Sequence, residues 1–251
     1  MQSAILNCAR PAVRLRFNVH AVRRRTPSNV DGIFTEDAQK RAMRHILSFL
    51  IVLACLPVCA RAADLDVHVR TARGAPVSDA IVTVEPEART PAPLRFTQPL
   101  AMAQRGLQFD PFVLVVPVGA EVRFPNEDPV RHQVYSFSPT KTFELKLYGK
   151  DQTRTVRFDK AGVVSLGCNI HDQMVAFIKV TDAPFAVKTD ASGHAVLHGL
   201  PVGRATIRVW HPYMKSPNGE QKLDLAIPRT GSIAQSFTAE LRTPAMRMPG
   251  Y

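Results

Sequence analysis

Three side chains that can bind a metal occur at every third position of one short stretch. They are Cys168, His171 and Met174, in the run Gly-Cys-Asn-Ile-His-Asp-Gln-Met, and they supply a thiolate, an imidazole and a thioether. Copper that cycles between Cu(I) and Cu(II) favours soft sulfur together with imidazole, and two histidines, one cysteine and a weak axial methionine form a blue-copper site. The stretch therefore supplies three such ligands and lacks one histidine.

The missing histidine is expected from a distant strand, because ligands held on separate strands keep a site rigid while the metal changes its charge. His132 fits, since it follows the turn-rich loop 124–131 and opens a predicted strand. Each of these residues alone is common in proteins without a metal. Together they predict one copper ion bound by His132, Cys168, His171 and Met174.

Residues 1–62 have the anatomy of an export signal. Arg44-His45 precedes the apolar run 46–59, and Ala60-Arg61-Ala62 is a small-x-small cleavage site. The mature protein is therefore expected to begin near Ala63 and to reside in the periplasm.

The signal peptide itself is expected to span residues 43–62, because Met43 stands directly before it. Residues 1–42, which are polar and arginine-rich, are interpreted as an over-long reading of the gene. Lipid anchoring at Cys55 is an alternative. No later segment approaches the roughly 20 apolar residues of a membrane-spanning helix, so no transmembrane span is expected in the mature chain.

Cysteine usage supports a metal thiolate. Cys8, Cys55 and Cys59 lie in the segment expected to be removed, which leaves Cys168 alone. Cysteines of exported proteins usually pair, so a solitary one needs a reason. It can be a small buried hydrophobic residue or form an intermolecular bridge, and the more specific interpretation is metal binding.

The net charge of +11 does not indicate a nucleic-acid partner. Residues 1–62 carry 10 of the 32 Lys and Arg residues but only 3 of the 21 Asp and Glu residues. The remainder has 22 basic and 18 acidic side chains, a net charge of +4, and no basic stripe interleaved with aromatic residues. Nucleic-acid binding is therefore excluded.

The elements that must position the ligands are short strands. Turn residues separate seven runs rich in β-branched and aromatic residues, and no helical period is sustained among them. These predicted strands are 112–118, 121–124, 132–137, 141–148, 154–158, 163–168 and 174–180. They fit one β-sandwich, in which His132 opens the third strand and Cys168 ends the sixth.

This region resembles the cupredoxin family. The resemblance rests on Val-x-Phe-x-Asn at 122–126 before the first histidine, and on Gly167 ahead of Cys-x-x-His-x-x-Met, whose short loop is similar to that of amicyanin. The order of motifs over 104–182 is also similar to cupredoxin-type proteins labelled methylamine utilisation protein. The resemblance implies a Greek-key copper domain over 100–182, with one type 1 copper ion held equatorially by two histidines and Cys168 and axially by Met174.

Three residues near the ligands depart from the pattern of blue copper proteins. Gln133 and Asn169 replace an Asn and a Ser or Thr that link the two ligand loops, and an amide pair is one way to restore this link. Asp172 places a charge beside the edge of His171, where relatives often present an apolar patch. Recognition of the partner is therefore expected to be partly electrostatic.

The flanks resemble a second, carboxypeptidase-regulatory-like (immunoglobulin-like) β-sandwich. Strands 65–70 and 80–84 are predicted to form a hairpin that corresponds to its first half. Thr-Asp-x-x-Gly at 189–193 and Leu-Pro-x-Gly at 200–203 correspond to its second half. The fold class is therefore all-β, with the cupredoxin sandwich inserted in, or followed by, a second sandwich made of 64–90 and 183–242.

The expected function is outer-sphere transfer of single electrons. Four protein ligands leave no open position on the metal for a substrate, so no enzymatic activity is expected. The edge of His171 is the expected exit for the electron, and a redox protein, either a dehydrogenase or a c-type cytochrome, is the expected partner. One alternative is a copper-binding protein without redox turnover, either a store or a chaperone. The other is a metal-free β-sandwich binding module.

The remaining histidines are not expected to bind a metal. His68 alternates on a strand and should be exposed. His194 and His198 are four residues apart, a spacing that would align them on a helix, but their surroundings predict strand and turn.

Overall fold

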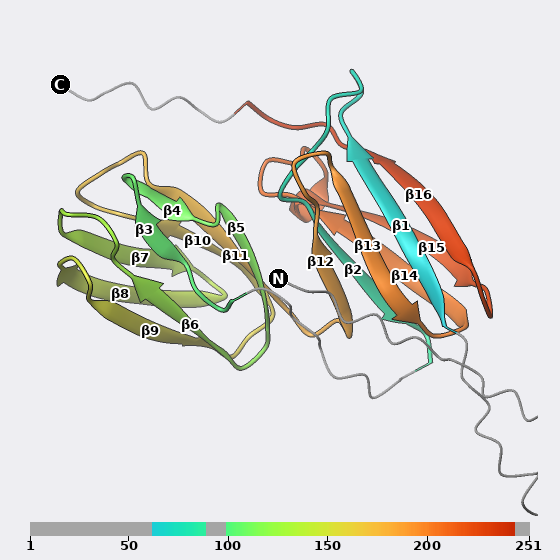
Figure 1. The fold of residues 1–251 in the computed structure, drawn as a ribbon, viewed down its shortest axis with the longest axis horizontal. Coiled ribbons are helices and arrows are strands. Elements are labelled where there is room, and N and C mark those ends of the chain that lie inside the picture. Colours follow the sequence, from blue (N-terminus) through green and yellow to red (C-terminus); the bar gives the residue numbers. More distant parts are fainter. Residues whose placement is uncertain (1–61, 89–98, 244–251) are drawn as a thin grey trace, which may run out of the picture. The chain divides into compact units, whose positions relative to one another are not determined.

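The computed structural model describes residues 62–88 and 99–243. The predicted signal region therefore lies almost entirely outside the described residues, as does most of the connector between the first two strands and the central region. Every described element is a strand apart from one short 3-10 turn at Pro217–Gly219, so the all-β prediction is confirmed (Figure 1). Among the described residues, no helix is long and apolar enough to cross a membrane.

The central region contains the seven predicted strands, each correct to within one residue at either end, and two further short ones. These are β3 (Ala103–Arg105), β4 (Gln108–Asp110), β5 (Val113–Pro117), β6 (Ala120–Pro125), β7 (His132–Ser138), β8 (Lys141–Tyr148), β9 (Thr153–Phe158), β10 (Gly162–Gly167) and β11 (Val175–Thr181). A five-stranded sheet has the order β5-β11-β10-β7-β8, while β6 pairs with β9 and β3 with β4.

Period-2 alternation decides which side chains of this region face its core. In β6 the alternate residues Val122 and Phe124 are fully buried, and in β7 the same alternation buries His132 together with Val134. Successive side chains of a strand point to opposite faces. His132 therefore shares the interior face of β7 although its imidazole is polar.

Strands from both ends of the described chain share two further sheets (Figure 1). They are β1 (Ala63–Arg70), β2 (Ile81–Pro86), β12 (Phe185–Lys188), β13 (His194–Leu200), β14 (Gly203–Trp210), β15 (Glu220–Ile227) and β16 (Ser232–Thr238). One sheet has the order β13-β1-β16 and the other β12-β2-β14-β15. Most of their buried residues form one hydrophobic cluster that runs from Ala63 to Ala239 in sequence.

The predicted hairpin between the first two strands is wrong. β1 pairs with β13 and β16, whereas β2 pairs with β12 and β14 in the other sheet. The physical reason is that each strand has an apolar face, with Leu65 and Val67 on β1 and Val82 and Val84 on β2, and all four side chains enter the same cluster. Placing the strands in opposite sheets buries both faces against each other.

Candidate metal centre

The structure brings His132, Cys168 and His171 together. Their ligand atoms all lie within 4.8 Å of one another, and His132 Nδ1 is 3.9 Å from Cys168 Sγ. The two imidazole rings are 5.0 Å apart between centroids and inclined by 61°. Metal–sulfur and metal–nitrogen bonds are about 2.0–2.3 Å long, so donor atoms that share an ion lie within roughly 4.5 Å of each other. The 3.9 Å between His132 Nδ1 and Cys168 Sγ therefore suits a single ion.

The ligands reach this point from two adjacent strands. His132 is the first residue of β7, while Cys168 directly follows β10, whose last residue Gly167 pairs with Tyr135 of β7. A Cβ atom on Gly167 would lie 2.6 Å from the ring of Tyr135. Glycine therefore allows the two strands to approach where the cysteine leaves the sheet.

The fourth predicted ligand, Met174, closes the loop between β10 and β11. Its backbone N–H donates to the carbonyl of His171 at 2.9 Å, which forms a tight turn. Its side chain is 1% exposed and belongs to the same hydrophobic cluster as Cys168. The structure thus buries Met174 near the other residues, and its axial role stays a prediction.

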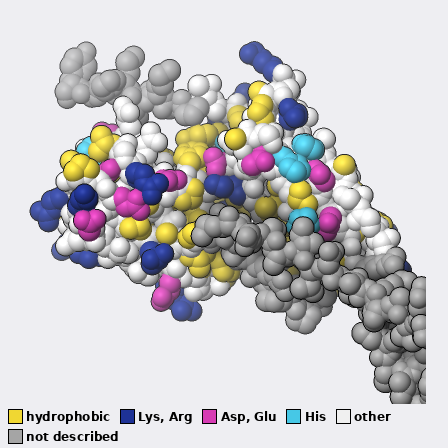
Figure 2. All heavy atoms as spheres, in the orientation of Figure 1, with side chains coloured by type: hydrophobic (Ala, Val, Ile, Leu, Met, Phe, Trp, Pro, Cys, Tyr) yellow, Lys and Arg dark blue, Asp and Glu magenta, His cyan; other side chains and the backbone are white. Residues whose placement is uncertain are grey.

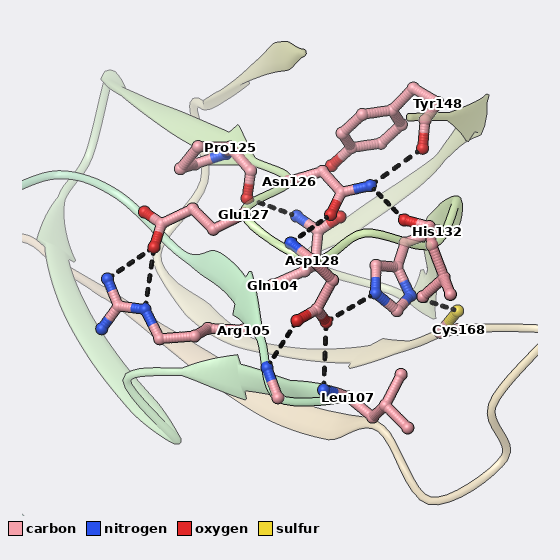
Figure 3. Close-up of polar contacts among 12 residues, drawn as sticks. Gln104, Arg105, Leu107, Pro125, Asn126, Glu127, Asp128, His132, Tyr148 and Cys168 are labelled. Carbon is pink, nitrogen blue, oxygen red and sulfur yellow. Dashed lines mark hydrogen bonds and ion pairs between the residues drawn. The ribbon is translucent and has the colours of Figure 1, made fainter. Parts of the chain in front are cut away.

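The sequence analysis did not identify Asp128, whose carboxylate contacts the ring nitrogen of His132 that faces away from Cys168 (Figure 3). Asp128 Oδ2 lies 2.8 Å from His132 Nε2, and both side chains are buried. Because the carboxylate can only accept, Nε2 carries the proton and Nδ1 is left as the acceptor that faces Cys168. Such carboxylate–histidine pairs fix the ring and make it a stronger metal ligand. The sequence signal was an acidic residue four positions before the histidine.

Asp128 is held as an ionised group. Burial alone would raise its pKa, but hydrogen bonds from Leu107 N–H, His132 and Gly106 N–H together lower the pKa below its usual value. The Gly106 N–H lies 2.6 Å from Oδ1, and the Leu107 N–H lies 3.0 Å from Oδ2. The negative charge next to His132 is therefore a stable part of the site.

The loop that carries Asp128 is organised by Asn126, the asparagine of the Val-x-Phe-x-Asn motif. Its side-chain amide donates to the carbonyls of Val130 at 2.8 Å and Tyr148 at 3.1 Å, and its Oδ1 accepts the N–H of Asp128 at 2.9 Å (Figure 3). Asn126 is fully buried. One amide thus ties two positions of the loop to each other and to the end of β8.

An amide link between Gln133 and Asn169 does not join the two ligand loops. Gln133 donates a short hydrogen bond to Glu144 of β8, and Asn169 is exposed. Asn126 and Asp128 supply the connections around His132 instead.

The donor set fits a copper ion. His171 Nδ1 is buried without a hydrogen-bond partner, although a buried imidazole nitrogen nearly always has one. His171 belongs to the same group of potential metal ligands as Cys168 and His132. One thiolate and two imidazoles are the soft and borderline ligands that copper selects.

No family model matches the chain, and no curated protein is similar to it. Among solved structures, a Cu-containing nitrite reductase from Thermus scotoductus SA-01 is 27% identical with a TM-score of 0.32, over 39% of this chain and 25% of that chain. A purple cupredoxin from Nitrosopumilus maritimus is 22% identical with a TM-score of 0.30, over 32% and 98%. A reduced amicyanin variant is 17% identical with a TM-score of 0.32, over 39% and 99%. The chain thus spans a quarter of the length of the nitrite reductase and nearly all of the two small proteins.

Proposed function

We propose that residues 100–182 form a cupredoxin domain with one type 1 copper ion, and that this domain transfers single electrons in the periplasm. His132, Cys168 and His171 would be the equatorial ligands and Met174 the axial one. The observation that carries the proposal is the convergence of one sulfur and two imidazoles within 4.8 Å. Copper bound there would supply a Cu(I)/Cu(II) couple.

The surroundings of the site suit outer-sphere transfer. His132 is buried on β7, and Cys168 is buried directly after the end of β10, which limits rearrangement when the metal changes its charge. His171 is only half-buried, and its neighbours Ile170 and Asp172 are exposed. Its ring edge is therefore the route by which an electron would leave, and a redox protein such as a dehydrogenase or a c-type cytochrome is the partner that we propose.

The proposal is tested by loading the mature chain with Cu(II). We expect one copper per chain, an intense sulfur-to-copper band in the visible spectrum, a narrow copper hyperfine splitting in paramagnetic resonance, and a reversible one-electron redox titration. Copper binding without reversible redox chemistry would instead favour a store or chaperone. Protein purified from periplasm that neither contains nor takes up copper would favour a metal-free binding module.

Replacing Asp128 by asparagine should destabilise the fold and change the potential. The carboxylate accepts three hydrogen bonds with two oxygens, so the amide of Asp128→Asn must turn an N–H toward at least one donor. A buried donor left unpaired costs about 1–3 kcal/mol of unfolding free energy. The reduction potential should rise, because the loss of a negative charge near the metal favours Cu(I).

Urea unfolding and a redox titration measure these two effects. Asp172→Asn removes an exposed carboxylate from the same site and should leave the unfolding free energy within about 0.5 kcal/mol of wild type. An Asp128→Asn protein with unchanged stability and potential would show that Asp128 does not support His132.

A further inference from the structure

A second group of metal-binding side chains lies on the outward face of the sheet β13-β1-β16. It comprises Asp66 and His68 of β1 and His194 of β13, and its ligand atoms also lie within 4.8 Å of one another. His68 and His194 stand opposite each other in the antiparallel ladder, and Asp66 is two residues away on the same face. Figure 2 shows histidine and acidic side chains gathered over these two strands.

The three side chains converge on one point. Asp66 Oδ1 lies 3.0 Å from His194 Nε2 and 3.3 Å from His68 Nε2. The two imidazole rings are stacked, with centroids 4.8 Å apart and planes inclined by 27°. Both rings therefore direct Nε2 at the same carboxylate oxygen, and the three ligand atoms lie close enough together to bind one ion.

The backbone around His194 is fixed before any ligand binds. Asp190 Oδ1 accepts the N–H groups of Ser192 at 2.8 Å and His194 at 3.0 Å, and Gly193 donates to Asp190 O at 3.0 Å. Gly193 has φ of +74°, and a Cβ there would lie 2.4 Å from the carbonyl oxygen of Val69. This turn therefore packs against β1 and places His194 directly opposite His68, as a preorganised site requires.

We propose that Asp66, His68 and His194 bind a divalent transition-metal ion of the Zn²⁺ class, separate from the copper centre. Two imidazoles and one carboxylate are a borderline ligand set that suits zinc, whereas Ca²⁺ and Mg²⁺ select oxygen ligands. The three side chains are 31–42% exposed. A fourth position therefore remains open to water, as in zinc sites with three protein ligands. His68 Nδ1 has no hydrogen-bond partner, so the contacts that orient this ring are those of its Nε2 with Asp66 and its stacking on His194.

Zinc titration of the copper-loaded mature chain tests this proposal. Calorimetry should show one zinc ion per chain beyond the filled copper site, and His68→Asn or His194→Asn should weaken it at least about 100-fold. The loss of a direct ligand should cost at least this much, because the loss of a residue that only hydrogen-bonds to a ligand already lowers metal affinity about 10–100-fold. Excess Mg²⁺ should not displace the zinc.

His198→Asn is the matched control. His198 lies on β13, the strand that carries His194. It is 75% exposed and pairs with Asp64 at 3.0 Å, outside the proposed group. Its variant should bind zinc as tightly as wild type. Nitrogen NMR of the imidazole rings gives a second readout that does not depend on the copper site: the signals of His68 and His194 should shift at one equivalent, and that of His198 should not. Absence of zinc binding, or equal weakening in the control variant, would overturn the proposal.

Discussion

A Cys168→Ser variant is expected to lose the intense visible band of the copper-loaded protein completely. That band is a transition from sulfur to copper, and Cys168 is the only cysteine among the described residues. A serine hydroxyl is a hard oxygen donor that stays protonated near neutral pH, so it neither replaces the transition nor favours Cu(I). The remaining imidazoles of His132 and His171 would hold copper only weakly.

Visible absorption, paramagnetic resonance and metal analysis together measure this loss. Copper retained by the variant should show the wide hyperfine splitting of a site without thiolate. Met174→Leu is the matched comparison, because it removes the proposed axial sulfur of the same loop and leaves the thiolate in place. It should keep the band and change mainly the reduction potential. A serine variant that keeps the band would refute the assignment of Cys168.

The unfolding free energy controls for a folding defect in the serine variant. Cys168 is 2% exposed, and a buried hydroxyl costs about 1–3 kcal/mol when it lacks a partner. A cooperative unfolding transition of the serine variant would show that the fold persists. Loss of the band in a folded protein then reports on the ligand alone.

Local pattern was sufficient to predict the strands of the central region and the three side chains, His132, Cys168 and His171, that the structure brings together. Alternation and turn residues gave β8 at its observed bounds, 141–148, and placed His132 at the first residue of its strand. Cys168 and His171 are three residues apart, so their proximity needs only one loop. The prediction that His132 lies beside this loop rested on the expectation that ligands come from separate strands.

Contacts that depend on how distant strands pair were not predicted from the sequence. His68 and His194 are 126 positions apart and meet only because β1 pairs with β13 in one register. A shift by one residue would turn either histidine to the opposite face of the sheet. For the same reason the first two strands were predicted as a hairpin, since the apolar pattern shows which face is buried but not which sheet a strand joins. Asp128 was missed because its contact depends on how loop 126–131 folds back.

The second large effect is expected at Asn126. An Asn126→Ala variant should lose about 2–4 kcal/mol of unfolding free energy, because it leaves the carbonyls of Val130 and Tyr148 and the N–H of Asp128 without their buried partner. The backbone of residue 126 still bonds to Gln152, so the damage starts in the loop rather than in β6. Copper affinity should fall as well, since the loop positions the carboxylate that holds His132.

Urea unfolding and a copper competition titration measure the two losses, and Asn169→Ala provides the control. Asn169 is an exposed asparagine next to Cys168, so its removal should change the unfolding free energy by no more than about 0.5 kcal/mol. If both variants were equally stable, the buried amide would not organise the loop. If Asn126→Ala were destabilised but bound copper as wild type does, the loop would support the fold without positioning His132. The Val-x-Phe-x-Asn motif therefore supports the metal centre only if Asn126→Ala lowers both the unfolding free energy and the copper affinity.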